Sequence, residues 1–180
     1  MNEDTVEGGP SQQEEILQTK AKLDKLLRHI RNVQEACELL GKKLIEKAEN
    51  HADIDFGVRL IALGQIHDFS KYSGIEWDYL TIHPSNSNGA LVLAITHHQR
   101  TNKHHVEFWG EINLMPKIYL AELVCDVYCR ATEFGTDVRE YIKDKLMSKY
   151  DISPQGKVYK YIKEFLDLLL EKPFETLDVR

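Results

Sequence analysis

The first strong signal in the chain is a long stretch in which apolar residues recur at steps of three and four. Lysine and glutamate fill the opposite side, and the pattern predicts an amphipathic helix from about Gln12 to Glu49. Its apolar positions are Ile16, Leu23, Leu26, Leu27, Ile30, Val33, Cys37, Leu40 and Leu44. His29 lies on or beside this stripe, and we therefore expect its side chain to point inward.

The same helical period returns in later segments of the chain. The polar stretch 50–55 predicts a break in which Asp53 or Asp55 caps the next helix, and 83–89 is typical of a loop. No sustained apolar–polar alternation and no tight hairpin signal is present. The sequence therefore predicts an all-α fold, a single-domain bundle of about six helices. The later helices are predicted at about 56–70, 90–98, 117–133, 138–149 and 156–171, with a short one at 76–82.

The length of the chain suits one domain. A chain of 180 residues can bury a substantial core, and we expect the helical domain to cover residues 12–172. The segment 1–11 is polar and contains Gly8-Gly9-Pro10, which predicts a flexible N-terminal tail. Lys172-Pro173 is expected to stop the last helix, so that residues 173–180 form a short C-terminal tail.

Charge and cysteine content narrow the class of protein. A net charge of −6 at pH 7 argues against a nucleic-acid partner, but not against a small anionic substrate, because a bound metal can reverse the local field. No apolar run is long enough to span a membrane, and the acidic start does not resemble a signal peptide. The three cysteines show no framework pattern, so we expect reduced thiols and a cytoplasmic protein. The leucine-rich last helix packs either inward or across a homodimer interface.

Histidine is concentrated in the middle of the chain. Six of the eight histidines lie between His67 and His105. His67 is followed by Asp68 at the predicted end of a helix, and histidine and aspartate both bind divalent metals. The pairs 97–98 and 104–105 flank a short polar segment. Adjacent helical residues point about 100° apart, so at most one of each pair faces a given site. The alternative is a histidine-rich surface loop.

Asp126 is a single acid inside an apolar run. A buried carboxylate is costly unless it is paired or bound to a metal. Its partner is therefore either a metal or a local cation, Arg130 or Lys117. The alternative is a surface ladder of charges formed by Glu122, Asp126 and Arg130, which are spaced one helical turn apart.

Taken together, these residues form an ordered set that resembles the HD-domain superfamily of metal-dependent phosphohydrolases. The order is a histidine on the first long helix, then His67-Asp68, then further histidines, then Asp126 on a later helix. The run 67–71 is similar to the His-Asp-x-Gly-Lys motif, with Ser70 in place of the glycine. Together with the segment 98–105, it also resembles a small bacterial and phage HD-like family that is catalogued mainly as a domain of unknown function.

The resemblance implies an HD-like fold and a ligand set for one or two divalent metal ions. Asp68 would bridge the two metals, and both Asp68 and Lys71 would take part in catalysis. Lys71, Arg100 and Asn102 would contact the substrate. The identity of the metal stays open among Mn, Mg, Fe, Ni, Co and Zn. The first metal would be held by His29, His67, Asp68 and Asp126, and the second by Asp68, His98 and either His104 or His105.

The function implied is hydrolysis of a phosphoester, on a nucleotide or a related small molecule. Two alternatives stay open from the same residues. One is an HD-fold oxygenase with a mixed-valent pair of irons, which uses a similar ligand set. The other is a non-catalytic binding protein that keeps the fold and a metal.

Overall fold

The computed structural model describes residues 11–82 and 88–170, and all regular structure in this part of the chain is helical. The predicted tail 173–180, and all of the predicted tail 1–11 except Ser11, lie outside the described residues. The α-helices are α1 Gln12–Glu46, α2 His51–Gln65, α3 Gly74–Glu76, α4 Asn88–Thr101, α5 Val106–Trp109, α6 Lys117–Glu133, α7 Val138–Ile142 and α8 Lys157–Leu170. Short 3-10 or π segments are η1 Phe69–Tyr72, η2 Trp77–Ile82, η3 Ile112–Leu114 and η4 Lys143–Met147.

The predicted long helices have counterparts, and the all-α prediction is confirmed. The described residues contain eight α-helices rather than about six. The short helix predicted at 76–82 corresponds to the end of α3 and the π segment η2, whereas α5 lies in a stretch for which no helix was predicted. The helix start at Gln12 is as predicted, and Ser11 caps it in a reciprocal arrangement with Glu14. The helix predicted at 138–149 is divided into α7 and the π segment η4.

The predicted boundaries of the second helix were wrong. Helix α2 begins at His51, because the Asn50 side chain accepts hydrogen bonds from the backbone N–H groups of Ala52 and Asp53, at 2.9 and 3.1 Å. The proposed caps Asp53 and Asp55 therefore lie inside the helix. Its C-terminal end comes at Gln65 rather than at Ser70, so the His-Asp pair lies in a turn beyond the helix.

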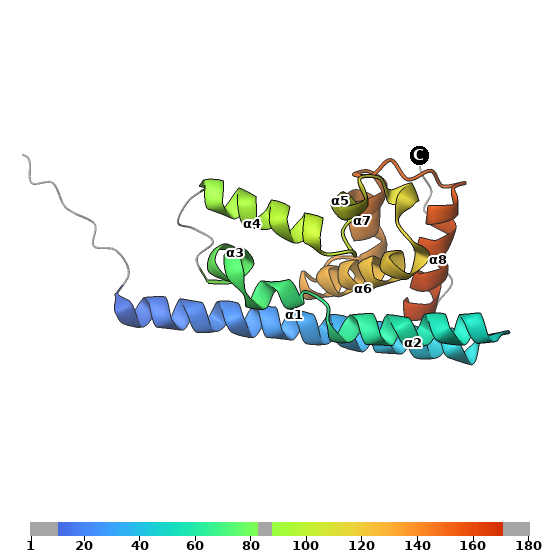
Figure 1. Ribbon diagram of the computed structural model, residues 1–180, viewed down its shortest axis with the longest axis horizontal. Helices are drawn as coiled ribbons and strands as arrows, with labels where there is room; N and C mark the ends of the chain where they lie inside the picture. The colour runs from blue at the N-terminus through green and yellow to red at the C-terminus, as the bar shows by residue number, and fades with distance from the viewer. Residues whose placement is uncertain (1–10, 83–87, 171–180) are drawn as a thin grey trace, which may run out of the picture.

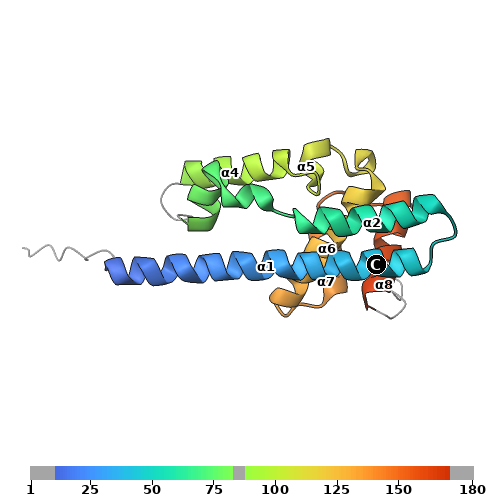
Figure 2. The same ribbon diagram turned by 60° about the horizontal axis from the view of Figure 1, so that its bottom comes forward.

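Helix α1 runs along the whole molecule, and α2 returns beside its C-terminal half (Figures 1 and 2). Glycines allow the two helices to approach closely. A Cβ atom on Gly41 would lie 2.8 Å from the carbonyl oxygen of Gly57, and one on Gly64 would lie 2.6 Å from the Cβ of Cys37. This contact fixes the end of α2, and hence the His-Asp turn, against the middle of α1.

The hydrophobic core gathers around the C-terminal half of α1, with α6 and α8 packed against it. Val33, Cys37 and Leu40 of α1 are fully buried there. The first turns of α1 extend beyond this core, where Ile16 and Leu17 are each 61% exposed. The predicted inward stripe of α1 is therefore fully buried only between His29 and Gly41. Segment η2 lies beside the projecting half of α1.

The three cysteines are buried and free, which agrees with the expectation of reduced thiols. None of the described helices combines the length and the apolar character needed to cross a membrane.

Candidate metal centre

The backbone of Asp68 is held in an unusual conformation. Its φ of 55° and ψ of 20° place it in the left-handed region, between the end of α2 and the start of η1. This region costs a residue with a side chain about 1 kcal/mol, although aspartate and asparagine tolerate it better than most. The turn directs the carboxylate inward, and Asp68 is only 2% exposed.

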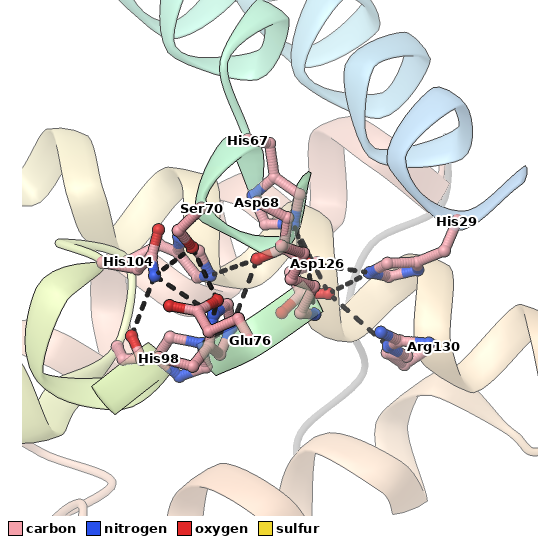
Figure 3. A network of polar contacts seen from close by, with 12 residues as sticks. His29, His67, Asp68, Ser70, Glu76, His98, His104, Asp126 and Arg130 are labelled. Atoms are coloured by element: carbon pink, nitrogen blue, oxygen red, sulfur yellow. Dashed lines mark hydrogen bonds and ion pairs between the residues drawn. The ribbon is translucent and has the colours of Figure 1, made fainter. Parts of the chain in front are cut away.

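The two carboxylate oxygens of Asp68 face different groups of histidines (Figure 3). Oδ1 lies 3.2 Å from Nε2 of His98 and 3.5 Å from Nε2 of His104. Oδ2 lies 3.5 Å from Nε2 of His67 and 4.0 Å from Nε2 of His29. Asp68 thus stands between two sets of imidazole nitrogens, one on each oxygen.

The first group joins α1, the turn after α2, and α6. Nε2 of His29 lies 3.0 Å from Oδ1 of Asp126, and Nε2 of His67 lies 4.0 Å from the same oxygen. His29, His67 and Asp68 each offer one possible ligand atom, and these atoms lie within 4.8 Å of one another, close enough to bind one metal ion. Asp126 faces this group from α6, as the sequence order predicted.

The second group comes from the end of α4 and the turn that follows it. His98, His104, His105 and Asp68 offer atoms that lie within 4.8 Å of one another. Nε2 of His105 lies 2.9 Å from Nε2 of His98. In the first histidine pair, the residue that faces Asp68 is His98. In the second pair, both residues face the group, with His104 buried and His105 partly buried.

Several buried polar atoms at the centre of this cluster have no hydrogen-bond partner among the described residues. Such atoms are rare in folded proteins, because an unpaired buried polar group costs about 1–3 kcal/mol. The atoms are Nε2 of His29, His67 and His104, Oδ1 of Asp68 and Oδ1 of Asp126; those of His29 and Asp126 form an ion pair with each other at 3.0 Å. Ligand atoms of His67, His104 and Asp126 lie within 4.8 Å of one another, which fits a bound cation.

A buried glutamate on α6 orients two of these histidines from behind. Oε1 of Glu122 lies 3.0 Å from Nδ1 of His67 and 3.4 Å from Nδ1 of His104. Burial raises the pKa of Glu122, but hydrogen bonds from the two histidines outweigh it and lower the pKa. An ionised carboxylate only accepts hydrogen bonds, so Nδ1 of His67 carries a proton and its Nε2 faces the centre.

Glu76 of α3 performs the same task for the second group. It is fully buried, and its Oε2 accepts hydrogen bonds of 2.8 Å from Nδ1 of His98 and 2.7 Å from Oγ of Ser70. Its Oε1 accepts one from Nδ1 of His97, whose side chain is half exposed. Burial raises the pKa of Glu76, but these hydrogen bonds lower it to about 2.

Glu133, at the end of α6, orients His29. Its two oxygens lie 3.0 and 3.1 Å from Nδ1 of His29, and Asn32 donates to Oε1 at 2.9 Å. The four histidines His29, His67, His98 and His104 therefore share one arrangement, with Nδ1 toward an outer glutamate and Nε2 toward the centre. Metal-binding histidines are usually held in this way.

The electrostatics of the cluster favour a cation. Burial lowers the pKa of His67, but the charge of Asp68 and the hydrogen bond to Glu122 outweigh it and raise the pKa to about 9. Burial raises the pKa of Asp68, yet the neighbouring His67 and Lys71 hold it well below its usual range. Burial and the neighbouring histidines lower the pKa of His105 to about 3, which keeps this imidazole neutral.

The remaining predicted site residues do not all lie at the metal centre. Nζ of Lys71 lies 2.6 Å from Oδ2 of Asp68, beside the centre. Asn102 belongs to the outer network, because its Nδ2 donates to Oγ of Ser70 at 2.9 Å. Arg100 is exposed on α4, outside both histidine groups. His51, which the sequence left unassigned, is exposed at the start of α2.

The outer glutamates are the part of the site that sequence reasoning missed. The surface ladder considered for α6 was wrong for Glu122, which is only 4% exposed. Glu122, Asp126 and Glu133 are spaced by four and seven residues, so they share one face of α6. That spacing was the available signal for Glu133. Glu76 follows the His-Asp run closely in the sequence, but only the tertiary fold brings it to His98.

Comparison with known families gives one match for the chain. Residues 18–168 match a family of unknown function, DUF5662. No curated protein and no solved structure matches the chain. The family match includes every residue of the two histidine groups and all three outer glutamates. Since it covers most of the sequence, the chain belongs to the DUF5662 family.

Proposed function

We propose that the protein is a metal-dependent phosphohydrolase. It binds one or two divalent metal ions in the cluster around Asp68 and hydrolyses a small phosphoester. The observation that carries the proposal is the position of Asp68, whose Oδ2 faces Nε2 of His67 and His29 and whose Oδ1 faces Nε2 of His98 and His104. Of these four nitrogens, only that of His98 has a hydrogen-bond partner among the described residues. A carboxylate shared in this way suits a pair of metals. The resemblance of the ordered ligand set to HD-domain phosphohydrolases supports the same reaction class.

The residues of the chain divide the work of hydrolysis. When bound, a divalent metal supplies Lewis acidity, which acidifies water and withdraws charge from phosphoryl oxygens. The ionised Asp68 orients the attacking water, whose oxygen forms the new bond to phosphorus as the ester P–O bond breaks. Lys71, 2.6 Å from Asp68, stabilises the negative charge that develops on the phosphoryl group. The attacking water gives up one proton and the leaving oxygen takes one up, so that the ester and water become an alcohol and a phosphate.

The donor set favours particular metals. The two groups offer more imidazole nitrogens than carboxylate oxygens. Imidazole suits Fe, Ni, Zn and similar ions, whereas Mg prefers an all-oxygen shell with several waters. We therefore expect Mn, Fe, Co, Ni or Zn in the protein rather than Mg.

A phosphoester panel tests this proposal. The wild-type protein, loaded in turn with each metal, is assayed against nucleoside monophosphates, cyclic nucleotides and p-nitrophenyl phosphate. The Asp68→Asn variant keeps the size of the side chain and tolerates the left-handed backbone, so it is expected to fold and to lose at least 100-fold in rate. His51→Gln is the matched control, because His51 is exposed and outside the cluster.

Two outcomes would contradict the proposed function. Equal hydrolysis by wild type and Asp68→Asn would remove Asp68 from the reaction. Failure to hydrolyse any phosphoester, together with two irons per chain and the EPR signal of a mixed-valent pair, would favour the oxygenase alternative.

A further inference from the structure

One face of α1 carries lysines that the metal centre does not use. Lys22, Lys25 and His29 are spaced by three, four and seven residues, so they line one side of the helix. Lys25 precedes His29 by a single turn. The side of α1 that brings His29 to the metal centre therefore continues, toward the N-terminus, as a basic surface.

These lysines line a cavity beside the metal centre. The cavity has a volume of about 300 Å³, at the lower end of the range of small-molecule pockets. Among the described residues, four of its lining side chains are cations and none is a carboxylate, although the whole chain has a net charge of −6. The described lining is Lys22, Lys25, Leu26, Lys71, Leu80 and Arg130, and we call it the α1 basic pocket.

The α1 basic pocket adjoins the metal centre through two of its cations. Nζ of Lys71 lies 2.6 Å from Oδ2 of Asp68, and Nε of Arg130 lies 3.9 Å from Oδ1 of Asp126. Both cations stand between the aspartates of the centre and the cavity. Lys22 and Lys25 complete the positive lining from α1.

A second cavity extends the same basic region. It has a volume of about 480 Å³ and shares Lys25 with the α1 basic pocket. Arg28 adds another cation to it, and Glu133 is the one carboxylate among the described residues of its lining. Cations of α1 thus line two adjoining hollows.

We propose that the substrate carries a second phosphate group, which binds in the α1 basic pocket while the scissile phosphate lies at the metal centre. The proposal rests on the phosphohydrolase function and narrows its substrate class to compounds with at least two phosphates. Lys22 and Lys25 bind the second phosphate, and Lys71 lies between the two phosphate positions. Leu26 and Leu80 provide an apolar wall for the carbon part of the molecule.

Calorimetric titration of the full chain with inorganic probes tests the pocket directly. Orthophosphate and pyrophosphate are titrated separately, with magnesium in excess over each probe so that the probe does not strip metal from the protein. Wild type is expected to bind pyrophosphate at least tenfold more tightly than orthophosphate. The Lys22→Gln/Lys25→Gln double variant keeps helix propensity and is expected to lose at least tenfold in pyrophosphate affinity.

The control has the same change in net charge at another place on α1. Lys20→Gln/Lys42→Gln removes two exposed lysines that do not line the pocket, and it is expected to bind pyrophosphate within twofold of wild type. Affinity of wild type should also fall more steeply with salt than that of the pocket variant. Equal pyrophosphate affinity in wild type and the pocket variant would overturn the proposal, as would an equal loss in the control.

The result separates this inference from the proposed reaction. If no phosphoester is hydrolysed but pyrophosphate binding is lost only in the pocket variant, the anion site stands and the reaction falls. If hydrolysis is found and the pocket variant cleaves mono- and bisphosphates as wild type does, the reaction stands and the second-phosphate site falls.

Discussion

The hydroxyl of Ser70 donates a 2.7 Å hydrogen bond to Oε2 of Glu76, the same oxygen that accepts from Nδ1 of His98 at 2.8 Å. Ser70 is the position at which the sequence departs from the glycine of the His-Asp-x-Gly-Lys motif. The hydroxyl thus takes part in a chain that runs from the turn after α2, through α3, to a histidine of the second group. The residue that replaces the glycine of the motif therefore hydrogen-bonds to Glu76, whose role the sequence did not reveal.

Removing this hydroxyl is expected to lower the stability of the folded protein and to loosen the hold of Glu76 on the second histidine group. Ser70→Ala should lower the free energy of unfolding by about 1.5–3 kcal/mol, because Glu76 is fully buried and loses a donor to a charged group. Ser70→Thr retains the hydroxyl and is the control. Chemical denaturation measures the loss, and equal stability of Ser70→Ala and wild type would show that the hydrogen bond contributes nothing.

Glu122 is expected to control metal affinity without touching the metal. Glu122→Gln keeps an acceptor oxygen but loses the charge that favours the protonated Nδ1 of His67 and His104. Loss of such an outer ligand typically lowers metal affinity 10–100-fold. Competition with a chromogenic chelator measures the change. Glu164→Gln, on the exposed face of α8, is the control. An unchanged affinity in Glu122→Gln would contradict the orienting role.

The close contact between α1 and α2 can be tested by replacing glycine with alanine at one position inside the contact and at one position outside it. Gly64→Ala should destabilise the protein by about 1–3 kcal/mol, because the new Cβ would lie 2.6 Å from that of Cys37. Gly89→Ala lies in α4 with nothing within 4 Å of the new Cβ, and it should stabilise by up to about 1 kcal/mol. Thermal unfolding compares the two, and a neutral Gly64→Ala would mean that the helices do not meet as closely as described.

The stability of the segment after the second histidine group should depend on pH. Oε1 of Glu107 accepts hydrogen bonds from Lys149 and Tyr150, at 2.8 and 2.9 Å. Burial raises the pKa of Glu107, but these partners outweigh it and lower the pKa. A lowered pKa in the folded state means that the stabilisation is fully present above the unfolded pKa of about 4.3 and is lost as the pH falls through the folded pKa.

Glu107→Gln measures this contribution. The variant should be less stable than wild type by about 1 kcal/mol at pH 7, and the difference should shrink as the pH falls below about 4. Glu111→Gln, an exposed neighbour, should show no such trend. A difference between Glu107→Gln and wild type that stays constant from pH 7 to pH 3 would exclude a role for the ionised carboxylate.

The all-α class could be predicted from the sequence because the period of three and four, which identifies α1, is a local pattern. The inner residues of the site were predicted from their order along the chain, which resembles that of HD-domain proteins. A lone acid in an apolar run made Asp126 a candidate but left a surface ladder of charges open. Which histidine of 97–98 faces Asp68 could not be read, because this depends on how α4 is rotated against η1. The outer glutamates were missed for a similar reason. Glu76 meets His98 only through the tertiary fold, and ordinary helix-surface charges explain Glu122 and Glu133 equally well.

The boundaries of α2 show a different limit of sequence reasoning. The apolar pattern begins at Phe56, whereas the helix begins at His51, because the capping side chain of Asn50 rather than burial decides where it starts. At the other end, the helical period continues through Ile66, but the left-handed Asp68 turns the chain. A buried carboxylate in a left-handed turn is a place where local propensity does not predict the end of a helix.

The most direct test of the metal centre is the metal content of the purified chain, measured by inductively coupled plasma mass spectrometry for wild type, Asp68→Asn and His51→Gln. Wild type and His51→Gln are expected to hold the same one or two transition-metal or zinc ions per chain, and Asp68→Asn, folded by circular dichroism, is expected to hold fewer than a tenth as many. Metal content in Asp68→Asn equal to that of wild type, or no metal in wild type after growth and dialysis with Mn, Fe, Co, Ni and Zn in turn, would contradict a metal centre built on Asp68.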